Sequence, residues 1–156
     1  MSVIAEPTQE LLERTRQRFH PLCMVCGRPC PSALGLEFRL LDDGSVQARF
    51  VCSKSHQGFR DILHGGVISS LLDGAMTNCL FAHGIAAVTA ELVVHFRHPI
   101  ATGAPLTVVG RISRSSPPLY VLDAEIIQDG TIMAIGKGKF MEMKPSGSAP
   151  WPDFPI

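Results

Sequence analysis

The spacing of apolar and polar residues predicts two helices and six strands. Apolar and polar side chains alternate over residues 36–41 and 45–52, which is typical of strands with one buried face. Helical spacing occupies residues 7–19 and residues 65–82, and the second stretch begins with paired glycines and ends just before Gly84. Four further β-rich runs follow it, over residues 87–97, 105–113, 119–128 and 131–143.

Turn residues separate these elements. Asp42-Asp43-Gly44 and Asp129-Gly130 are typical of tight hairpins. Strands and helices do not alternate along the chain, so the order predicts an α+β fold with an antiparallel sheet. With 156 residues we expect a single domain, residues 1–156. A helix and a Pro- and Cys-rich loop (residues 1–33) would precede its core (residues 34–143), and a Pro-rich tail (residues 144–156) would follow.

The long helix carries an unusually wide apolar stripe, at positions 67, 68, 71, 72, 75, 76, 79 and 80. A stripe this wide predicts a helix wrapped by sheet on most sides. The polar exceptions are spaced three and four residues apart and therefore share one narrow face: Ser69, Ser70, Asp73 and Thr77. A carboxylate on a largely buried helix is costly unless it is paired or hydrated. Asp73 is thus a candidate functional acid, and the alternative is an aspartate on the remaining solvent face.

The start of this helix is a candidate anion site. Gly65 and Gly66 leave backbone N–H groups uncovered by side chains, and the first N–H groups of a helix lack intrahelical partners. Such donors stabilise the oxyanion of acyl transfer by about 3 kcal/mol each. The alternative is that the glycines only allow close packing against strands. By itself, His64 is interpreted as structural, although it could also be a cap or a site residue.

Composition excludes several classes of function. Lys plus Arg and Asp plus Glu number 14 each, so there is no electrostatic case for a nucleic acid or an anionic membrane surface. Residues 1–20 lack the apolar segment of a signal peptide, and no apolar run is long enough to span a bilayer. Five cysteines cannot all pair within one chain. These features predict a cytoplasmic protein.

Four residues near the N-terminus have the spacing of metal ligands: His20, Cys23, Cys26 and Cys30. A single CxxC is common by chance, however, so we do not expect a metal here, although the sequence leaves open whether these four residues bind one. Cys52 and Cys79 fall in a predicted strand and helix and are interpreted as core thiols.

Several stretches together resemble one known family. HGGVISSLLDGAM resembles the HGG…D signature of hotdog-fold acyl-CoA thioesterases of the PaaI-like group. The resemblance covers residues 22–141 and is carried by order and spacing. Its other parts are CMVCGRPCPSALGLEF, HQGFRDILHGG, VTAELVVHFRHPIATGAPLTVVGRI and PLYVLDAEIIQDGTIMAIGKGKF.

The resemblance implies a hotdog fold, in which a long central helix is wrapped by a curved antiparallel sheet of five to six strands. It implies a homodimer with sites at the interface, with a homotetramer left open, and it implies no cofactor, since coenzyme A is part of the substrate. By position, Asp73 matches the catalytic general base or nucleophile. Gly65 and Gly66 match the oxyanion-hole amides, Thr89 a hydroxyl that orients water, and His64 the motif histidine.

Four further residues are candidates for substrate contact: His56, Gln57, Ser70 and Arg97. Gln57 stands where some relatives carry Asn or Gln, and Arg97 could contact the CoA phosphates from its strand. Gly74 departs from the family pattern, because this branch often has Glu at that position.

The first hypothesis is therefore an acyl-CoA thioesterase that releases a carboxylic acid and CoA. The alternative is a hotdog protein that binds acyl-CoA without hydrolysing it, which Gly74 mildly favours. A hotdog dehydratase or hydratase is disfavoured, because its Asp and later His lie ahead of the helix. The sequence leaves open the acyl group, the nucleophile or general-base role of Asp73, and the choice between dimer and tetramer.

Overall fold

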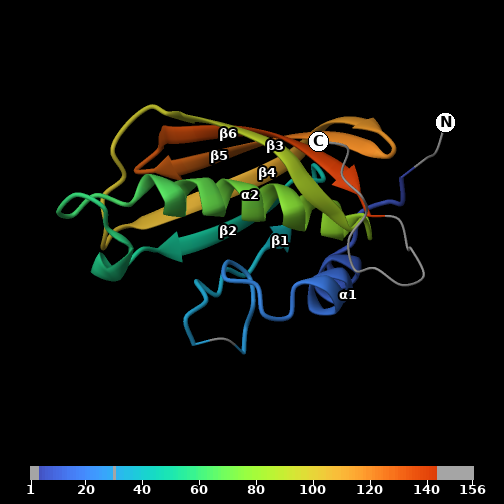
Figure 1. The fold of residues 1–156 in the computed structure, drawn as a ribbon, viewed down its shortest axis with the longest axis horizontal. Helices are drawn as coiled ribbons and strands as arrows, with labels where there is room; N and C mark the ends of the chain where they lie inside the picture. The colour runs from blue at the N-terminus through green and yellow to red at the C-terminus, as the bar shows by residue number, and fades with distance from the viewer. Residues whose placement is uncertain (1–3, 30, 144–156) are drawn as a thin grey trace.

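One curved antiparallel sheet wraps around a single long helix, α2 (Gly65–Ala82) (Figure 1). The structure is a computed structural model and describes residues 4–29 and 31–143. The strands lie in the order β1-β2-β4-β5-β6-β3. Their bounds are Arg39–Leu40 (β1), Val46–Val51 (β2), Ala87–Phe96 (β3), Pro105–Ser116 (β4), Leu119–Gln128 (β5) and Thr131–Glu142 (β6). This architecture confirms the predicted α+β hotdog fold.

The predicted element positions are close to the observed ones, with one clear exception. Residues 36–41 were expected to form a strand, but β1 is limited to Arg39–Leu40. Leu36 and Phe38 are buried, as the alternation indicates. The backbone of residues 34–36 instead forms hydrogen bonds with the preceding loop. Leu36 N, for example, donates to Val25 O at 2.9 Å. The hairpin at Asp129-Gly130 is confirmed, and both residues have positive φ as a type I′ turn requires.

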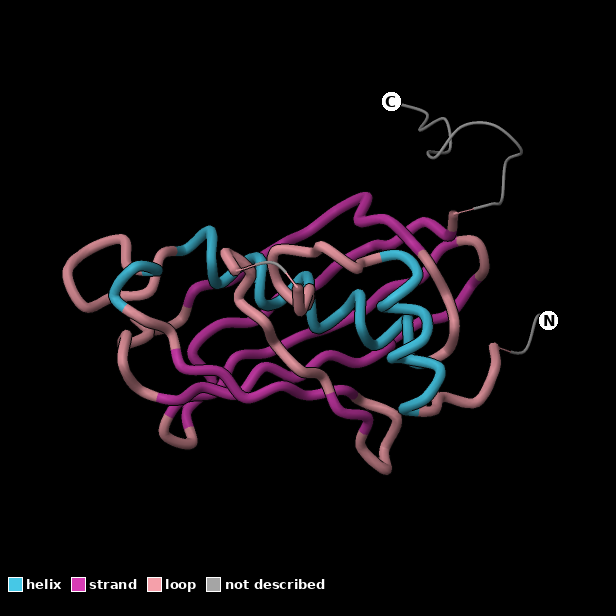
Figure 2. The backbone as a smooth tube through the Cα atoms, turned by 90° about the horizontal axis from the view of Figure 1, so that it is seen from below, coloured by secondary structure: helices cyan, strands magenta, loops and turns pink. Residues whose placement is uncertain are grey.

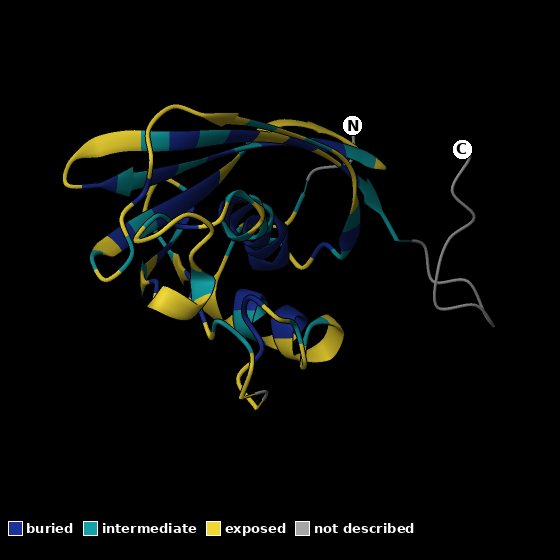
Figure 3. Ribbon diagram, turned by 60° about the vertical axis from the view of Figure 1, so that its left-hand side comes forward, coloured by how far each residue is buried: buried dark blue, intermediate teal, exposed yellow. Residues whose placement is uncertain are grey.

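The concave face of the sheet and α2 form the core (Figure 3). Along β5 every second residue is buried, which is the period-two pattern of a strand with one covered face. Glycine lets the helix approach the sheet closely. A Cβ on Gly110 would lie 2.6 Å from the carbonyl oxygen of Ala75, a distance that no side chain tolerates. Cys52 and Cys79 are buried, which confirms their assignment to the core.

The N-terminal segment packs against the side of α2 that the sheet leaves free (Figure 2). Helix α1 (Gln9–Phe19) is capped by the Thr8 hydroxyl, which accepts from Leu11 N at 3.1 Å. Arg16 of this helix is buried and donates to Cys26 O at 3.2 Å. That contact ties α1 to the following loop, residues 20–35, which we call the cysteine loop.

The convex face of the sheet is polar and carries ion pairs between neighbouring strands: Arg111–Glu125, Asp123–Lys137 and Glu91–Lys139. Strand β3 forms one edge of the sheet and is largely exposed along its length. In the described part of the chain, no helix is both long and apolar enough to cross a membrane. Cys30 and the predicted tail, residues 144–156, lie outside the described residues.

Candidate active site

His64 caps the start of α2 with its ring. Its Nδ1 accepts from Gly66 N at 2.8 Å, and its backbone carbonyl accepts from Val67 N and Ile68 N. The amide of Gly66 is therefore engaged. Among the described residues, the Gly65 amide is the donor of this first turn that has no hydrogen-bond acceptor. The amides of the two glycines therefore differ. The Gly65 N–H is free, whereas the Gly66 N–H binds the ring of His64.

This cap also sets the chemistry of His64. Because Nδ1 accepts a hydrogen bond, it carries no proton in the neutral ring, and the proton resides on Nε2. The side chain of His64 is exposed, so its Nε2–H is available to an incoming group near the Gly65 amide.

Asp73 lies two turns further along α2, and a residue of the sheet holds its side chain in place. Thr89, at the start of β3, donates from Oγ1 to Asp73 Oδ1 at 2.6 Å. Burial raises the pKa of Asp73 above its usual value, and the hydrogen bond from Thr89 opposes that shift. The carboxyl is only partly exposed, so it does not lie in bulk solvent. A half-buried acid with a raised pKa is suited to accept and return a proton.

Strand β3 runs antiparallel to α2 along this face (Figure 1). Thr89 contacts Asp73 near the middle of the helix, whereas the Phe96 ring lies beside Gly65 at its start. Gly65 and Asp73 are eight residues apart, which corresponds to about 12 Å along a helix axis. Two groups that act on one carbonyl must each lie within about 3 Å of it. The Gly65 amide and the Asp73 carboxyl of one chain are therefore too far apart to act together.

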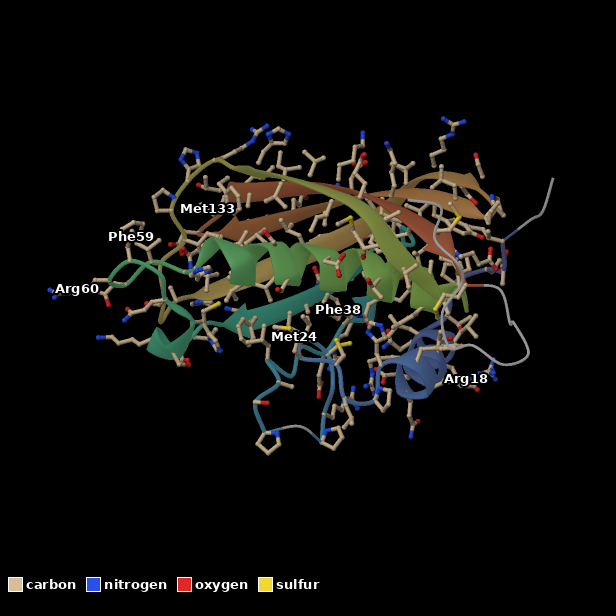
Figure 4. All side chains as sticks on the ribbon, in the orientation of Figure 1. Arg18, Met24, Phe38, Phe59, Arg60 and Met133 are labelled. Carbon is tan, nitrogen blue, oxygen red and sulfur yellow. The ribbon has the colours of Figure 1, made fainter. Side chains whose placement is uncertain are left out.

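An apolar pocket of about 360 Å³ opens next to Gly65. It lies between the start of α2, the loop before the helix and the end of β3, and it is lined by Phe59, Ile62, Leu63, Ile68, Phe96 and Ile100. Two of these side chains are unusually exposed for aromatic residues, Phe59 at 83% and Phe96 at 56%. Phe59 and Arg60 lie at the end of the molecule where α2 begins (Figure 4). Exposed apolar surface of this kind marks a ligand or protein contact.

The four residues that were expected to contact substrate differ in their surroundings. Arg97 lines the apolar pocket and is exposed. The other three side chains bond within the chain. His56 Nδ1 accepts from Ser53 N at 3.2 Å, Gln57 Oε1 accepts from Asp61 N at 3.0 Å, and Ser70 Oγ donates to Gly66 O at 2.9 Å. His56 and Gln57 thereby shape the loop before α2, and the backbone carbonyl of His56 accepts from His64 N at 2.9 Å.

The cysteine loop packs against α2 at Gly74, the residue that follows Asp73. A Cβ on Gly74 would lie 2.7 Å from Val25 Cγ1, so a larger residue at position 74 would displace the loop. This packing explains why glycine replaces the second carboxylate that the family pattern suggests. His20 and Cys23 are also close enough to influence the pKa of Asp73, in opposite directions. Sequence reasoning did not place the loop here, and the one available signal was the unusual glycine after Asp73.

The cysteines of this loop interact with each other. The pKa of Cys23 is lowered to about 3, chiefly by a hydrogen bond from the Cys26 side chain. The pKa of Cys26 is raised, first by the same contact and then by burial. One proton shared between two sulfur atoms accounts for both directions.

Comparisons with known proteins support the fold and the class of protein. A family model described as "Thioesterase superfamily" matches residues 61–134. The acyl-coenzyme A thioesterase PaaI of Escherichia coli (strain K12) is 27% identical over 111 residues, which cover 70% of this chain and 79% of that protein.

Solved structures give the same result. A crystal structure of a thioesterase superfamily protein superposes with a TM-score of 0.72 and 27% identity, over 76% of this chain and 62% of that one. The structure of the E. coli PaaI protein from the phenylacetic acid degradation operon gives a TM-score of 0.65 and 25% identity, over 70% of this chain and 84% of that one.

The fold and these matches define a thioester hydrolase with the hotdog fold. The chain is similar to the thioesterase superfamily over residues 61–134 and to PaaI-like members of that superfamily over about 70% of its length.

Proposed function

We propose that the protein hydrolyses acyl-CoA thioesters at two equivalent sites, each formed between two copies of the chain. Asp73 of one copy and the Gly65 amide of the other would act on the same thioester carbonyl. The observation that carries this proposal is the separation of the two groups, about 12 Å along one helix. A second copy supplies the missing partner without any change in the fold.

The exposed edge of the sheet supports this arrangement. Strand β3 carries exposed apolar residues, including Val93 at 43%, and an unpaired edge of this kind readily pairs with another strand. Antiparallel pairing of β3 with β3 of a second copy has a two-fold axis near the midpoint, close to Leu92 and Val93. That axis brings the Phe96 end of one strand beside Thr89 of the other. The Gly65 end of one helix then faces Asp73 of its partner.

The roles of the groups follow from their chemistry. The thioester oxygen accepts from Gly65 N–H and from His64 Nε2–H, which stabilise its negative charge in the transition state. Asp73 takes a proton from water as the water oxygen attacks the carbonyl carbon. The C–S bond then breaks, and the CoA sulfur leaves with the proton held by Asp73. Thr89 keeps the carboxyl group oriented through Oδ1, which leaves Oδ2 to face the water.

An alternative role for Asp73 gives the same products. The carboxylate can attack the carbonyl directly to form an anhydride, which water then hydrolyses. A single turnover in ¹⁸O-labelled water tests for the anhydride. Label in the Asp73 carboxyl identifies the nucleophile, because water attacking the anhydride at the Asp73 carbonyl places it there. Label in the released acid alone arises from the general base, and also from an anhydride that water opens at its acyl carbonyl.

The substrate class is supported by the pocket beside Gly65. Its apolar lining suits the acyl group or the adjoining part of the pantetheine arm, and Arg97 at its rim offers a cation to the CoA phosphates. The E. coli relative is named an acyl-coenzyme A thioesterase. Binding without hydrolysis was the alternative, but its main support was Gly74, which the contact with Val25 explains by packing.

A pair of complementary variants tests the shared site. Asp73→Ala removes the acid, and turnover of acyl-CoA is expected to fall at least about a hundredfold while acyl-CoA still binds. Gly65→Pro removes the free amide hydrogen at the first helical position, where proline is well tolerated. Gly65→Ala is its matched control, because it keeps the amide, and its Cβ meets only the Phe96 ring at 3.4 Å.

Mixing the two inactive variants gives the decisive measurement. Random exchange makes about half of the dimers mixed, each with one intact site of two, so about a quarter of the parent activity is expected to return. Calorimetric binding and thiol-release assays follow the two properties separately. No recovery after confirmed subunit exchange would show that both groups act within one chain, and an active Asp73→Ala protein would remove the acid from the mechanism.

A further inference from the structure

Three side chains behind the acid are arranged like ligands of a metal ion. His20 Nδ1, Cys23 Sγ and Cys26 Sγ all lie within 4.8 Å of one another. Imidazole nitrogen and thiolate sulfur are the donors that zinc prefers, at distances of about 2.0–2.3 Å from the metal. We propose that His20, Cys23 and Cys26 bind one zinc-type ion, which fastens the cysteine loop and the end of α1 to α2 next to Asp73.

The backbone holds the three donors in this position before any ion binds. His20 caps the end of α1, and its backbone N–H donates to Arg16 O at 2.7 Å. The chain then turns sharply, with Gly27 N donating to Cys23 O at 2.8 Å. A Cβ on Gly27 would lie 2.5 Å from that same oxygen, so the turn requires glycine. Val25 N also donates to Cys23 Sγ at 3.4 Å, and such donors favour the thiolate form that metals bind.

The ring of His20 is oriented toward the sulfur atoms. Its Nδ1 lies 3.9 Å from Cys26 Sγ, and the ring makes a T-shaped contact with Phe81 of α2, with the ring centroids 4.9 Å apart. A small inward movement of each donor would bring nitrogen and sulfur to their bonding distances. A pair of cysteines that served only to form a disulfide would not need an imidazole directed at it.

Buried polar groups surround the cluster in the way that supports a metal centre. Arg16 is 8% exposed and donates to the carbonyl of Cys26. Asn78 of α2 is fully buried beside the Cys26 side chain. Its amide nitrogen donates to Gly74 O at 2.8 Å, but its Oδ1 is the one buried side-chain polar atom that lacks a partner among the described residues. An unpaired buried oxygen costs free energy, and a water on the fourth metal position would donate to it.

The charges of this assembly balance. Two thiolates and a neutral imidazole around a divalent ion give a net charge of zero, which suits a half-buried position. The two thiol protons are released to solvent when the ion binds. The ion would fix Val25 against Gly74, and so would support α2 beside Asp73.

The test measures metal, so its result does not depend on turnover. Protein purified with reductant and without chelator is expected to contain one zinc per chain, as measured by elemental analysis. Replacement by Co²⁺ is expected to give thiolate-to-cobalt charge-transfer bands and the visible bands of a tetrahedral centre. His20→Ala, Cys23→Ala and Cys26→Ala should each weaken zinc binding by more than about tenfold in a chelator competition.

Two controls separate this site from other effects. Met24→Ala alters an exposed residue between the two cysteines, and Cys52→Ala removes a buried thiol elsewhere; both are expected to bind as the parent does. Mass spectrometry of the unmodified protein adds a measurement that does not depend on a variant folding, because bound zinc should protect the partly exposed Cys23 from alkylation. The proposal is overturned by a metal-free protein that takes up no Co²⁺, by binding that survives all three substitutions, or by a Cys23–Cys26 disulfide in the reduced preparation.

Discussion

Thr89 Oγ1 donates to Asp73 Oδ1 at 2.6 Å and so joins the edge strand of the sheet to the central helix at the proposed acid. The contact links residues 16 positions apart in the chain and fixes the carboxyl orientation. It also lowers the pKa of Asp73, against the larger effect of burial. The hydroxyl of Thr89 therefore controls both where the acid points and at what pH it ionises.

Thr89→Val removes this hydroxyl at nearly constant volume. Without the hydrogen bond, the pKa of Asp73 rises further, so the acidic limb of the pH–kcat/KM profile is expected to move to higher pH. The maximal rate should fall by roughly tenfold, because the carboxyl loses its orientation. Thr89→Ser keeps the donor and should keep the parent profile. An unchanged acidic limb in Thr89→Val would show that another group sets the pH dependence.

The raised pKa of Asp73 also predicts a stability cost. Burial favours the protonated carboxyl, so in the window between its usual value of 3.8 and the raised value the folded protein binds the proton better than the unfolded chain does. Stability is therefore lost as the pH rises through this window and stays lower above it. Asp73→Asn removes the charge at similar volume, and its melting temperature at neutral pH is expected to exceed that of the parent by a few degrees.

Calorimetry at neutral pH and at pH below 3.8 tests whether ionisation of Asp73 lowers the stability of the folded protein. The gain of Asp73→Asn should shrink toward zero in acid, where the parent carboxyl is protonated as well. A variant that is less stable than the parent at neutral pH would mean that the charged carboxylate is favoured by its surroundings. Activity should fall in the same variant, because the amide cannot accept the proton.

Much of the fold could be predicted because its signals are local. The apolar stripe of α2 and the Asp129-Gly130 turn depend on neighbouring residues, and both were located closely. The extent of β1 could not be predicted, since residues 34–36 satisfy their backbone through the cysteine loop instead of a strand. Alternation of side chains reports which face is buried but does not identify the hydrogen-bond partner.

The candidate site could likewise be predicted only in part. Spacing placed Asp73 and Gly65 on one helix, whereas hydrogen-bond geometry was needed to show that Gly66 N–H is already taken by His64. The roles of His56 and Gln57 in the loop also depend on rotamers that sequence does not encode. The approach of Cys23 to Asp73 spans 50 positions of the chain and follows from tertiary packing alone.

Gly74 and Val25 give a prediction about packing. A Cβ at position 74 would lie 2.7 Å from Val25 Cγ1, so Gly74→Ala should destabilise the protein by about 1–3 kcal/mol through overpacking. Val25→Ala should remove the clash and restore part of that loss in the double variant. Denaturant unfolding of the four proteins completes a double-mutant cycle. Strictly additive effects would show that Val25 is not the residue that requires glycine here.

His64 allows capping and catalysis to be separated. Its Nδ1 caps the helix, whereas its Nε2–H is the proposed second donor to the thioester oxygen. His64→Asn keeps a side-chain acceptor at a position where asparagine is a preferred cap, so stability should change little, while His64→Ala should lose about 1 kcal/mol. Both variants lack the Nε2–H, and both are therefore expected to lower kcat by about ten- to a hundredfold, with a smaller change in KM. If His64→Asn retained the parent kcat, the ring would serve only to start the helix, and the Gly65 amide would remain as the oxyanion donor.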